Sequence, residues 1–162
     1  MKSIYRFAAI ALIVLGLFSW WYYQTPRMLA RKIDGLISTL RFDPSTSRSS
    51  RLIKTSGIQS YFDEQVEITS PIDNANGNFS PEDLTSGYSF LTENAREISI
   101  ERVGQISCEL DGPHATQRFD CNAKVSVSRW LKNLNGRYEV TVHWKKTNDG
   151  WKIHSTDWKE IP

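Results

Sequence analysis

Four segments in the second half of the chain alternate apolar and polar residues, the pattern of antiparallel strands that bury one face. The segments begin near Glu97, Phe119, Tyr138 and Trp151. Turn-forming sequences separate them: Asp111-Gly112-Pro113, Asn135-Gly136 and Asn148-Asp149-Gly150. The first segment also contains Gly104, at a point where a sharply bent sheet favours a glycine. The alternation therefore predicts four long antiparallel strands with one face on a core.

Helical patterns precede these strands. Thr25-Pro26 predicts a helix start, and an apolar stripe follows it: Leu29, Ile33, Leu36, Ile37 and Leu40. A second helix is predicted over about residues 48–62, with a break near Gly57, and a short strand over Gln65 to Thr69. The sequence Ser80-Pro81-Glu82-Asp83 predicts a third helix that runs to about Asn94, because it combines an N-cap serine, an early proline and acidic residues in the first turn.

The N-terminal segment is apolar and uncharged from Phe7 to Tyr23. As a helix it would be ~25 Å long, just enough for a bilayer core with its aromatic end at the interface. A cleaved signal peptide is the alternative, but the best cleavage point, after Ser19, places the bulky Leu17 where a small residue is needed. We therefore expect a membrane anchor over residues 1–24, which inserts through residues 7–23, and one domain over residues 25–162.

The charge pattern argues against nucleic-acid binding, because the net charge of +2 comes from the anchor and the remainder is neutral. Residues 27–54 are basic and either attract anionic headgroups or form an ordinary solvated helix face. Positive residues flank the apolar segment on both sides, so charge alone does not set its orientation.

Cys108 and Cys121 are the only cysteines, and both fall on the apolar face of adjacent predicted strands. A symmetric hairpin centred between residues 114 and 115 would place them opposite each other. The sequence thus predicts a Cys108–Cys121 disulfide, with two buried thiols as the alternative. A disulfide implies an oxidising compartment, so we expect a cytoplasmic N-terminus and a periplasmic or extracytoplasmic domain at the inner membrane.

The element order, together with the closing sequence Asn148-Asp149-Gly150-Trp151-Lys152-Ile153-His154, resembles the nuclear transport factor 2-like superfamily over about residues 26–160. The resemblance implies an α+β fold, in which three helices pack on a curved antiparallel sheet to form a cone with a cavity, here behind a transmembrane helix. The superfamily includes enzymes, binding modules and single-span envelope proteins such as the VirB8-like secretion components. Fold alone therefore does not assign a function.

In enzymes of that superfamily the working groups face the cavity. An Arg102–Asp157 pair with Tyr138 nearby would form a polar patch on the face expected to line it, and a structural ion pair at the rim is the alternative. The ketosteroid isomerase constellation does not map onto the chain, and no hydrolase, zinc-protease or phosphate-loop motif is present. No cofactor is predicted.

The last predicted hairpin places His143 opposite His154 on the polar face. A histidine pair is a candidate for metal binding or pH sensing, but the sequence indicates no third ligand. We therefore expect ordinary exposed histidines and no metal site.

Trp130 and Trp158 fall on the otherwise polar face of the predicted sheet. Interfaces are enriched in tryptophan, so both are predicted to bind a protein partner or a second copy, unless a strand bulge or the C-terminal tail buries them. The sequence thus favours a binding or assembly module of an envelope complex over an enzyme. A small-ligand-binding protein or an enzyme that uses the cavity is the alternative.

Overall fold

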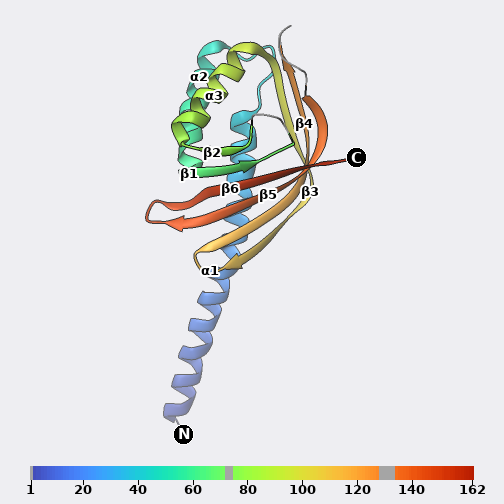
Figure 1. Ribbon diagram of the computed structural model, residues 1–162. Helices are drawn as coiled ribbons and strands as arrows, with labels where there is room; N and C mark the ends of the chain where they lie inside the picture. Colours follow the sequence, from blue (N-terminus) through green and yellow to red (C-terminus); the bar gives the residue numbers. More distant parts are fainter. Residues whose placement is uncertain (1, 72–74, 128–133) are drawn as a thin grey trace.

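The computed structural model describes residues 2–71, 75–127 and 134–162, with the backbone alone for residues 2–9 and 21–23. Figure 1 shows an α+β domain in which a curved sheet wraps around helices, and a long N-terminal helix that extends away from it. The predicted α+β architecture is therefore confirmed. Within the residues described, no helix is both long enough and apolar enough to cross a membrane.

The described strands form one six-stranded sheet in the order β2-β1-β6-β5-β4-β3. Their bounds are β1 (Phe62–Thr69), β2 (Gly77–Phe79), β3 (Ala95–Asp111), β4 (His114–Val127), β5 (Leu134–Thr147) and β6 (Gly150–Ile161). The four predicted strands are β3 to β6, which pair antiparallel in sequence order, as expected. β1 corresponds to the predicted short strand and pairs parallel to β6.

The first helix, α1 (Lys2–Leu40), is longer than expected. The prediction that a helix begins at Thr25-Pro26 is wrong, because α1 runs through Pro26 without a break. Proline inside a helix lacks one backbone hydrogen-bond donor, and α1 tolerates this loss because its next turns are held by packing. Leu29 and Ile33, from the predicted stripe, are buried against the sheet together with Trp144 and Ile153.

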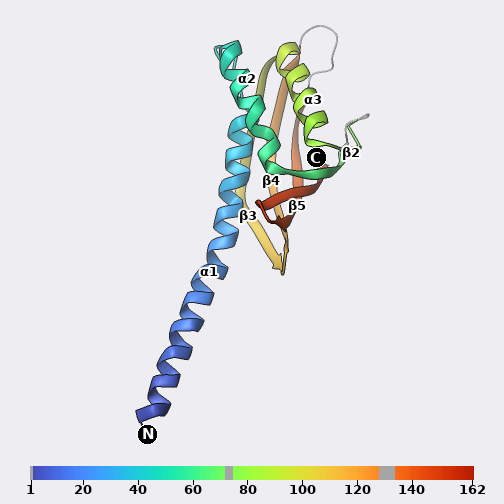
Figure 2. The same ribbon diagram turned by 90° about the vertical axis from the view of Figure 1, so that its left-hand side faces the viewer.

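The other helices cover one end of the sheet (Figure 2). They are α2 (Arg48–Gly57), the 3-10 turn η1 (Ile58–Tyr61) and α3 (Pro81–Asn94). α2 ends at Gly57, where the sequence predicts a break. α3 begins as predicted, with a capping box in which Ser80 accepts from the Asp83 backbone and Asp83 accepts from the Ser80 backbone.

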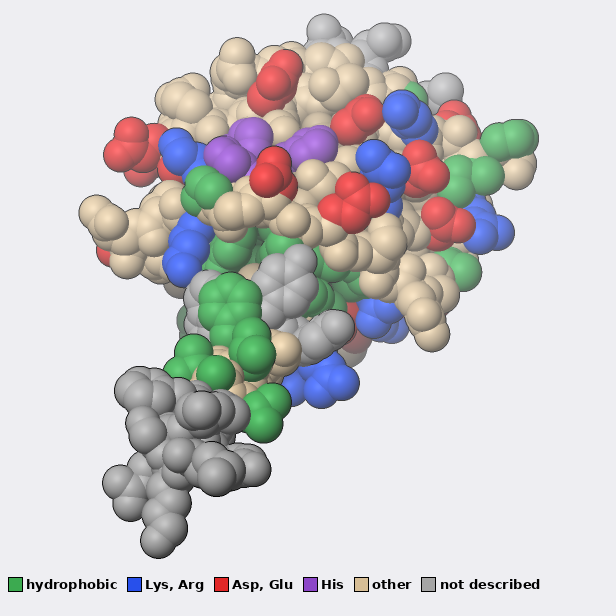
Figure 3. All heavy atoms as spheres, turned by 90° about the horizontal axis from the view of Figure 1, so that it is seen from below, with side chains coloured by type: hydrophobic (Ala, Val, Ile, Leu, Met, Phe, Trp, Pro, Cys, Tyr) green, Lys and Arg blue, Asp and Glu red, His purple; other side chains and the backbone are tan. Residues whose placement is uncertain are grey.

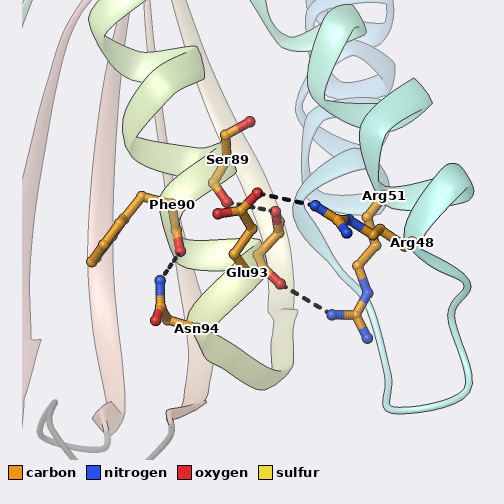
Figure 4. A network of polar contacts seen from close by, with 7 residues as sticks. Arg48, Arg51, Ser89, Phe90, Glu93 and Asn94 are labelled. Carbon is orange, nitrogen blue, oxygen red and sulfur yellow. Dashed lines mark hydrogen bonds and ion pairs between the residues drawn. The ribbon is translucent and has the colours of Figure 1, made fainter.

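Polar contacts fix α2 to α3 (Figure 4). The Arg51 guanidinium donates to the carbonyl oxygen of Thr92 over 3.0 Å and lies over the ring of Phe42, 4.3 Å from its centroid. An exposed ion pair joins Arg48 to Glu93 at 3.8 Å. Arg51 thus couples α3 to the smaller of the two cores, which contains Phe42, and so helps to hold α3 in place above the sheet.

Two of the register shifts in the sheet bear on the positions predicted from the sequence. In β3 the register shifts between Val103 and Ser107, next to Gly104, which has a φ of 73°. In the β5–β6 pair, Trp144 lies opposite Ile153, whereas His143 lies opposite Ser155, so His154 is left as an extra residue in β6. The register predicted for this hairpin is therefore confirmed up to Trp144 and wrong beyond it. Beyond His154 the two faces of β6 are therefore exchanged relative to the prediction: Trp158 faces the core and Asp157 does not.

Candidate functional site

A cavity of about 450 Å³ lies between α3 and the sheet. Its wall is almost entirely apolar, with Leu84 and Leu91 from α3 and Ile68, Ile100, Val125 and Trp158 from the strands. The register shift in β6 contributes the tryptophan, since Trp158 lies opposite Val140 and packs on the core. The cavity can therefore enclose a small molecule with a largely apolar surface.

Tyr138 brings one polar group to this wall. Its side chain is 5% exposed, and its ring lies edge-on to Trp158 with 6.2 Å between the centroids. No hydrogen-bond partner for its hydroxyl is present among the described residues. Burial, followed by Glu160 and Cys121, raises the pKa of Tyr138, so the phenol remains protonated and can donate a hydrogen bond.

Gly136 makes room for that tyrosine. A Cβ atom at position 136 would lie 2.8 Å from the Tyr138 Oη atom and 3.0 Å from its Cζ atom. The predicted turn at Asn135-Gly136 is wrong, because both residues pair with β4 inside the sheet. A glycine two residues before a tyrosine in a strand lies on the same face as the tyrosine, and this spacing is a signal that sequence reasoning missed.

A second tyrosine, Tyr88, lines the cavity but is already engaged. Its hydroxyl contacts the carbonyl oxygens of Thr39 and Leu40 at 3.1 and 3.0 Å, at the end of α1. Burial raises the pKa of Tyr88 to about 12, with an opposing effect from Arg51. Tyr88 therefore anchors α3 to α1 and leaves its hydroxyl no hydrogen atom for a ligand.

Asp83 is the one charged side chain among the described lining residues. Its carboxylate accepts hydrogen bonds from the Ser80 hydroxyl and backbone, and these bonds lower the pKa of Asp83. Because this carboxylate is committed to the helix cap, the free polar group that the described wall offers a ligand is the Tyr138 hydroxyl. The described wall thus offers a ligand an apolar surface and one hydroxyl that can donate a hydrogen bond.

Solved structures share this architecture. A putative scytalone dehydratase from Novosphingobium aromaticivorans matches with a TM-score of 0.66 at 12% identity, over 85% of each chain. A nuclear transport factor 2 (NTF2-like) superfamily protein from Salmonella enterica matches with a TM-score of 0.55 at 11% identity, over 83% of this chain and 86% of the other. The fold is NTF2-like. At these identities the NTF2-like match establishes the fold alone.

A third solved structure also shares the NTF2-like fold. A putative calcium/calmodulin dependent protein kinase II association domain from Xanthomonas campestris matches with a TM-score of 0.55 at 12% identity, over 84% of this chain and 87% of the other. No protein-family model and no curated protein matches the sequence.

The predicted Arg102–Asp157 pair does not form. Arg102 instead binds Asp34 of α1, with Nε 3.0 Å from Oδ1, and donates to the carbonyl oxygen of Gly104. Asp157 pairs with Lys159 at 3.4 Å. The extra residue His154 explains the error, because it turns Asp157 to the outer face of β6. Of the three residues predicted for the site, only Tyr138 lines the NTF2-like cavity.

Trp158 also lies on the other side of the sheet from the predicted one. The extra residue in β6 turns its indole into the cavity wall, so the expected position on the polar face is wrong. Trp130 lies outside the described residues. The predicted interface therefore loses one of its two tryptophans.

The predicted disulfide is also wrong, because both cysteines are free. Cys108 lies opposite Gln117, and Cys121 lies opposite Arg102. The hairpin turns at Gly112-Pro113, between the paired residues Asp111 and His114, and thus earlier than the symmetric model assumed. Burial, with a smaller effect of Asp120, raises the pKa of Cys121 to about 11, so this thiol stays protonated.

Proposed function

We propose that the chain binds a small apolar molecule in the cavity between α3 and the sheet. The observation that carries this proposal is an apolar wall with one hydroxyl, on Tyr138, that has no hydrogen-bond partner among the described residues. A ligand with a carbonyl or ether oxygen would accept a hydrogen bond from it. Apolar contacts provide the affinity, and Tyr138 orients the ligand.

Gly87 offers a way to test the cavity without damage to the fold. It lies on the α3 side of the cavity, and a Cβ atom there would meet nothing within 4 Å. Gly87→Leu should narrow the cavity while it stabilises the helix by about 0.5–1 kcal/mol, because glycine is a poor helix former. A loss of binding in this variant is therefore not a loss of folding.

The experiment compares two fluorescent probes on the full chain: N-phenyl-1-naphthylamine, which lacks a carbonyl, and prodan, which has a ketone. Gly87→Leu should weaken both probes relative to wild type in the same detergent, which corrects for partition into micelles. Tyr138→Phe should weaken prodan alone by about 2–12-fold, the value of one hydrogen bond. Equal binding of both probes by wild type and Gly87→Leu would show that the cavity is not the binding site.

We also propose that residues 7–23 anchor the chain in the inner membrane, with the domain outside the cytoplasm. In support, the described part of this segment is exposed along α1, including Leu12 at 70%, Phe18 at 62% and Trp20 at 64%. The N-terminal half of α1 also stands away from the domain (Figures 1 and 2). Exposed apolar surface of this extent calls for a bilayer or a partner.

The anchor has its own test. The full chain should remain in the membrane fraction after an alkaline carbonate wash, and alkaline phosphatase fused after Pro162 should be active. Release by carbonate, or an inactive fusion that is present in normal amounts, would contradict the anchor or its orientation respectively. Assembly in an envelope complex, the function favoured by the sequence, remains a proposal that now depends on Trp130 and on the exposed face of α1.

A further inference from the structure

All three histidines of the chain meet on the outer face of the sheet. His114 begins β4, His143 belongs to β5, and His154 is the extra residue of β6. The His154 ring centroid lies 6.1 Å from that of His143 and 6.2 Å from that of His114. Figure 3 shows histidine side chains grouped on the surface of this side of the molecule, and the proposed cavity makes no use of them.

The irregularity in β6 lies at the centre of this cluster. β6 pairs with β5 on one side and with β1 on the other, and His154 is the residue of the β5–β6 ladder that has no partner. As the extra residue, His154 lies between the pairs Trp144–Ile153 and His143–Ser155, and its ring reaches histidines from two other strands. His114 is thus the third candidate ligand, which the sequence alone did not indicate.

His143 is held in an orientation that suits a metal ligand. Its Nδ1 atom lies 3.1 Å from the Thr116 hydroxyl oxygen, which leaves the Nε2 atom available. Metal-binding histidines typically use one ring nitrogen for the ion and bind an oxygen through the other. The cluster thus has a ligand set and a supporting contact for one of its members.

Two charged groups beside the histidine cluster have opposite effects on a cation bound there. Asp63 and Lys145 form an ion pair at 3.6 Å, and both act on His154. Burial, followed by His143 and His114, lowers the pKa of His154. The Lys145 ammonium opposes a bound cation, whereas the Asp63 carboxylate favours one.

The rings are slightly too far apart in the conformation described. Two imidazoles on one tetrahedral zinc ion have ring centroids about 5 Å apart, so the His154–His143 and His154–His114 pairs must each approach by about 1 Å, and the His114 ring must also move toward that of His143. In agreement, no three metal-binding side chains in the described part of the chain are placed to share an ion. His114 is exposed and can rotate, whereas His143 and His154 are half-buried and set the position of the site.

We propose that His114, His143 and His154 close around a divalent transition-metal ion of the Zn²⁺ type, with water as the fourth ligand. Imidazole suits Zn²⁺, Cu²⁺ and Ni²⁺ better than Mg²⁺ or Ca²⁺. The ion would connect β4, β5 and β6 on the outer face, opposite the core.

The test uses Co²⁺ as a spectroscopic substitute for Zn²⁺, on the full chain at pH 7.5. We expect one ion per chain with the intense visible bands of tetrahedral Co²⁺, without the sulfur charge-transfer bands that Cys108 or Cys121 would produce. Zn²⁺ should displace Co²⁺, and Mg²⁺ should not. His154→Gln should weaken binding by at least ~10-fold, and Thr116→Val should weaken it less, because it removes only the supporting contact.

Lys145→Gln is the matched control on the same surface. It removes the opposing charge and keeps all three ligands, so it should leave metal affinity unchanged or raise it. The proposal is overturned by an octahedral cobalt spectrum, by no binding at millimolar metal, or by equal affinity of wild type and His154→Gln. Because cavity binding is measured with separate probes, its failure would not affect this result.

Discussion

Gly136→Ala tests whether the position of Tyr138, and with it the polar group of the cavity, depends on the missing side chain at residue 136. The added methyl group would lie 2.8 Å from Tyr138 Oη, 3.0 Å from Cζ and 3.1 Å from Cε2. Real Cβ atoms avoid such contacts, so the ring must tilt away from the strand or β5 must move.

The expected cost follows from two opposing effects. Overpacking of this kind costs about 1–3 kcal/mol. Alanine in place of glycine restricts the unfolded chain and recovers about 0.4–1 kcal/mol. The net loss should therefore be about 0.5–2 kcal/mol, which lowers the melting temperature of a domain of this size by about 2–8 °C.

Thermal unfolding of four chains measures this coupling: wild type, Gly136→Ala, Tyr138→Leu and the double variant. In the Tyr138→Leu background there is no ring to displace, so the cost of Gly136→Ala should vanish or reverse. Prodan affinity should fall in Gly136→Ala because the hydroxyl has moved. An equal cost of Gly136→Ala in both backgrounds, with prodan affinity unchanged, would refute the reasoning.

Four further predictions follow from the packing, the helix cap, the thiols and the histidines. Leu29→Ala removes a fully buried side chain where α1 meets the sheet and should cost about 3–5 kcal/mol in urea unfolding; a cost under about 1 kcal/mol would contradict the core position of α1. Ser80→Ala should cost about 1 kcal/mol through loss of the α3 capping box, whereas Ser86→Ala, in the same helix, serves as a control with little expected effect. Cys121, which is 0% exposed with a raised pKa, should resist alkylation in the native chain, and non-reducing mass analysis after unfolding should find both cysteines alkylated; an intact Cys108–Cys121 bond would restore the predicted disulfide. Burial and the other two histidines lower the pKa of His154 in the folded state below its ordinary value of 6.5, so the unfolded chain binds this proton more tightly. The free energy of unfolding should therefore fall as the pH drops below about 6.5. His154→Gln should weaken this pH dependence, and an equal pH dependence in wild type and variant would contradict the shift.

Local sequence patterns predicted the elements well. The Ser80 capping box and the break at Gly57 are encoded within a few residues, and the alternation in β3 to β6 follows directly from one-sided burial. Pairing was less predictable, because it depends on turn length. The disulfide prediction failed for this reason, since a turn centred two residues earlier moves Cys108 away from Cys121.

The cavity could be predicted only in part. Tyr138 follows from regular alternation, whereas Trp158 and Asp157 lie beyond the extra residue in β6. The intervening Ser155 and Thr156 are both polar and do not reveal which of them faces the core. His114 and His154 lie on β4 and β6, which are separated by β5, and their rings are in contact. The pairing of consecutive strands, which is what the sequence predicts, does not reveal such a contact.

Because His154 is an extra residue in β6, a mutation can delete it without a change in the side chains that line the cavity on the other face. Loss of one residue from a regular strand turns every following side chain over. Loss of the codon for His154 would instead join Ile153 to Ser155 in an unbroken ladder and keep Thr156 and Trp158 on the cavity side. Evolution can therefore add or remove the central histidine by a change in strand length, while the ligand cavity on the other face keeps its wall. Among relatives of this chain, a β6 that is shorter by this one residue should lack the central histidine and keep the cavity wall.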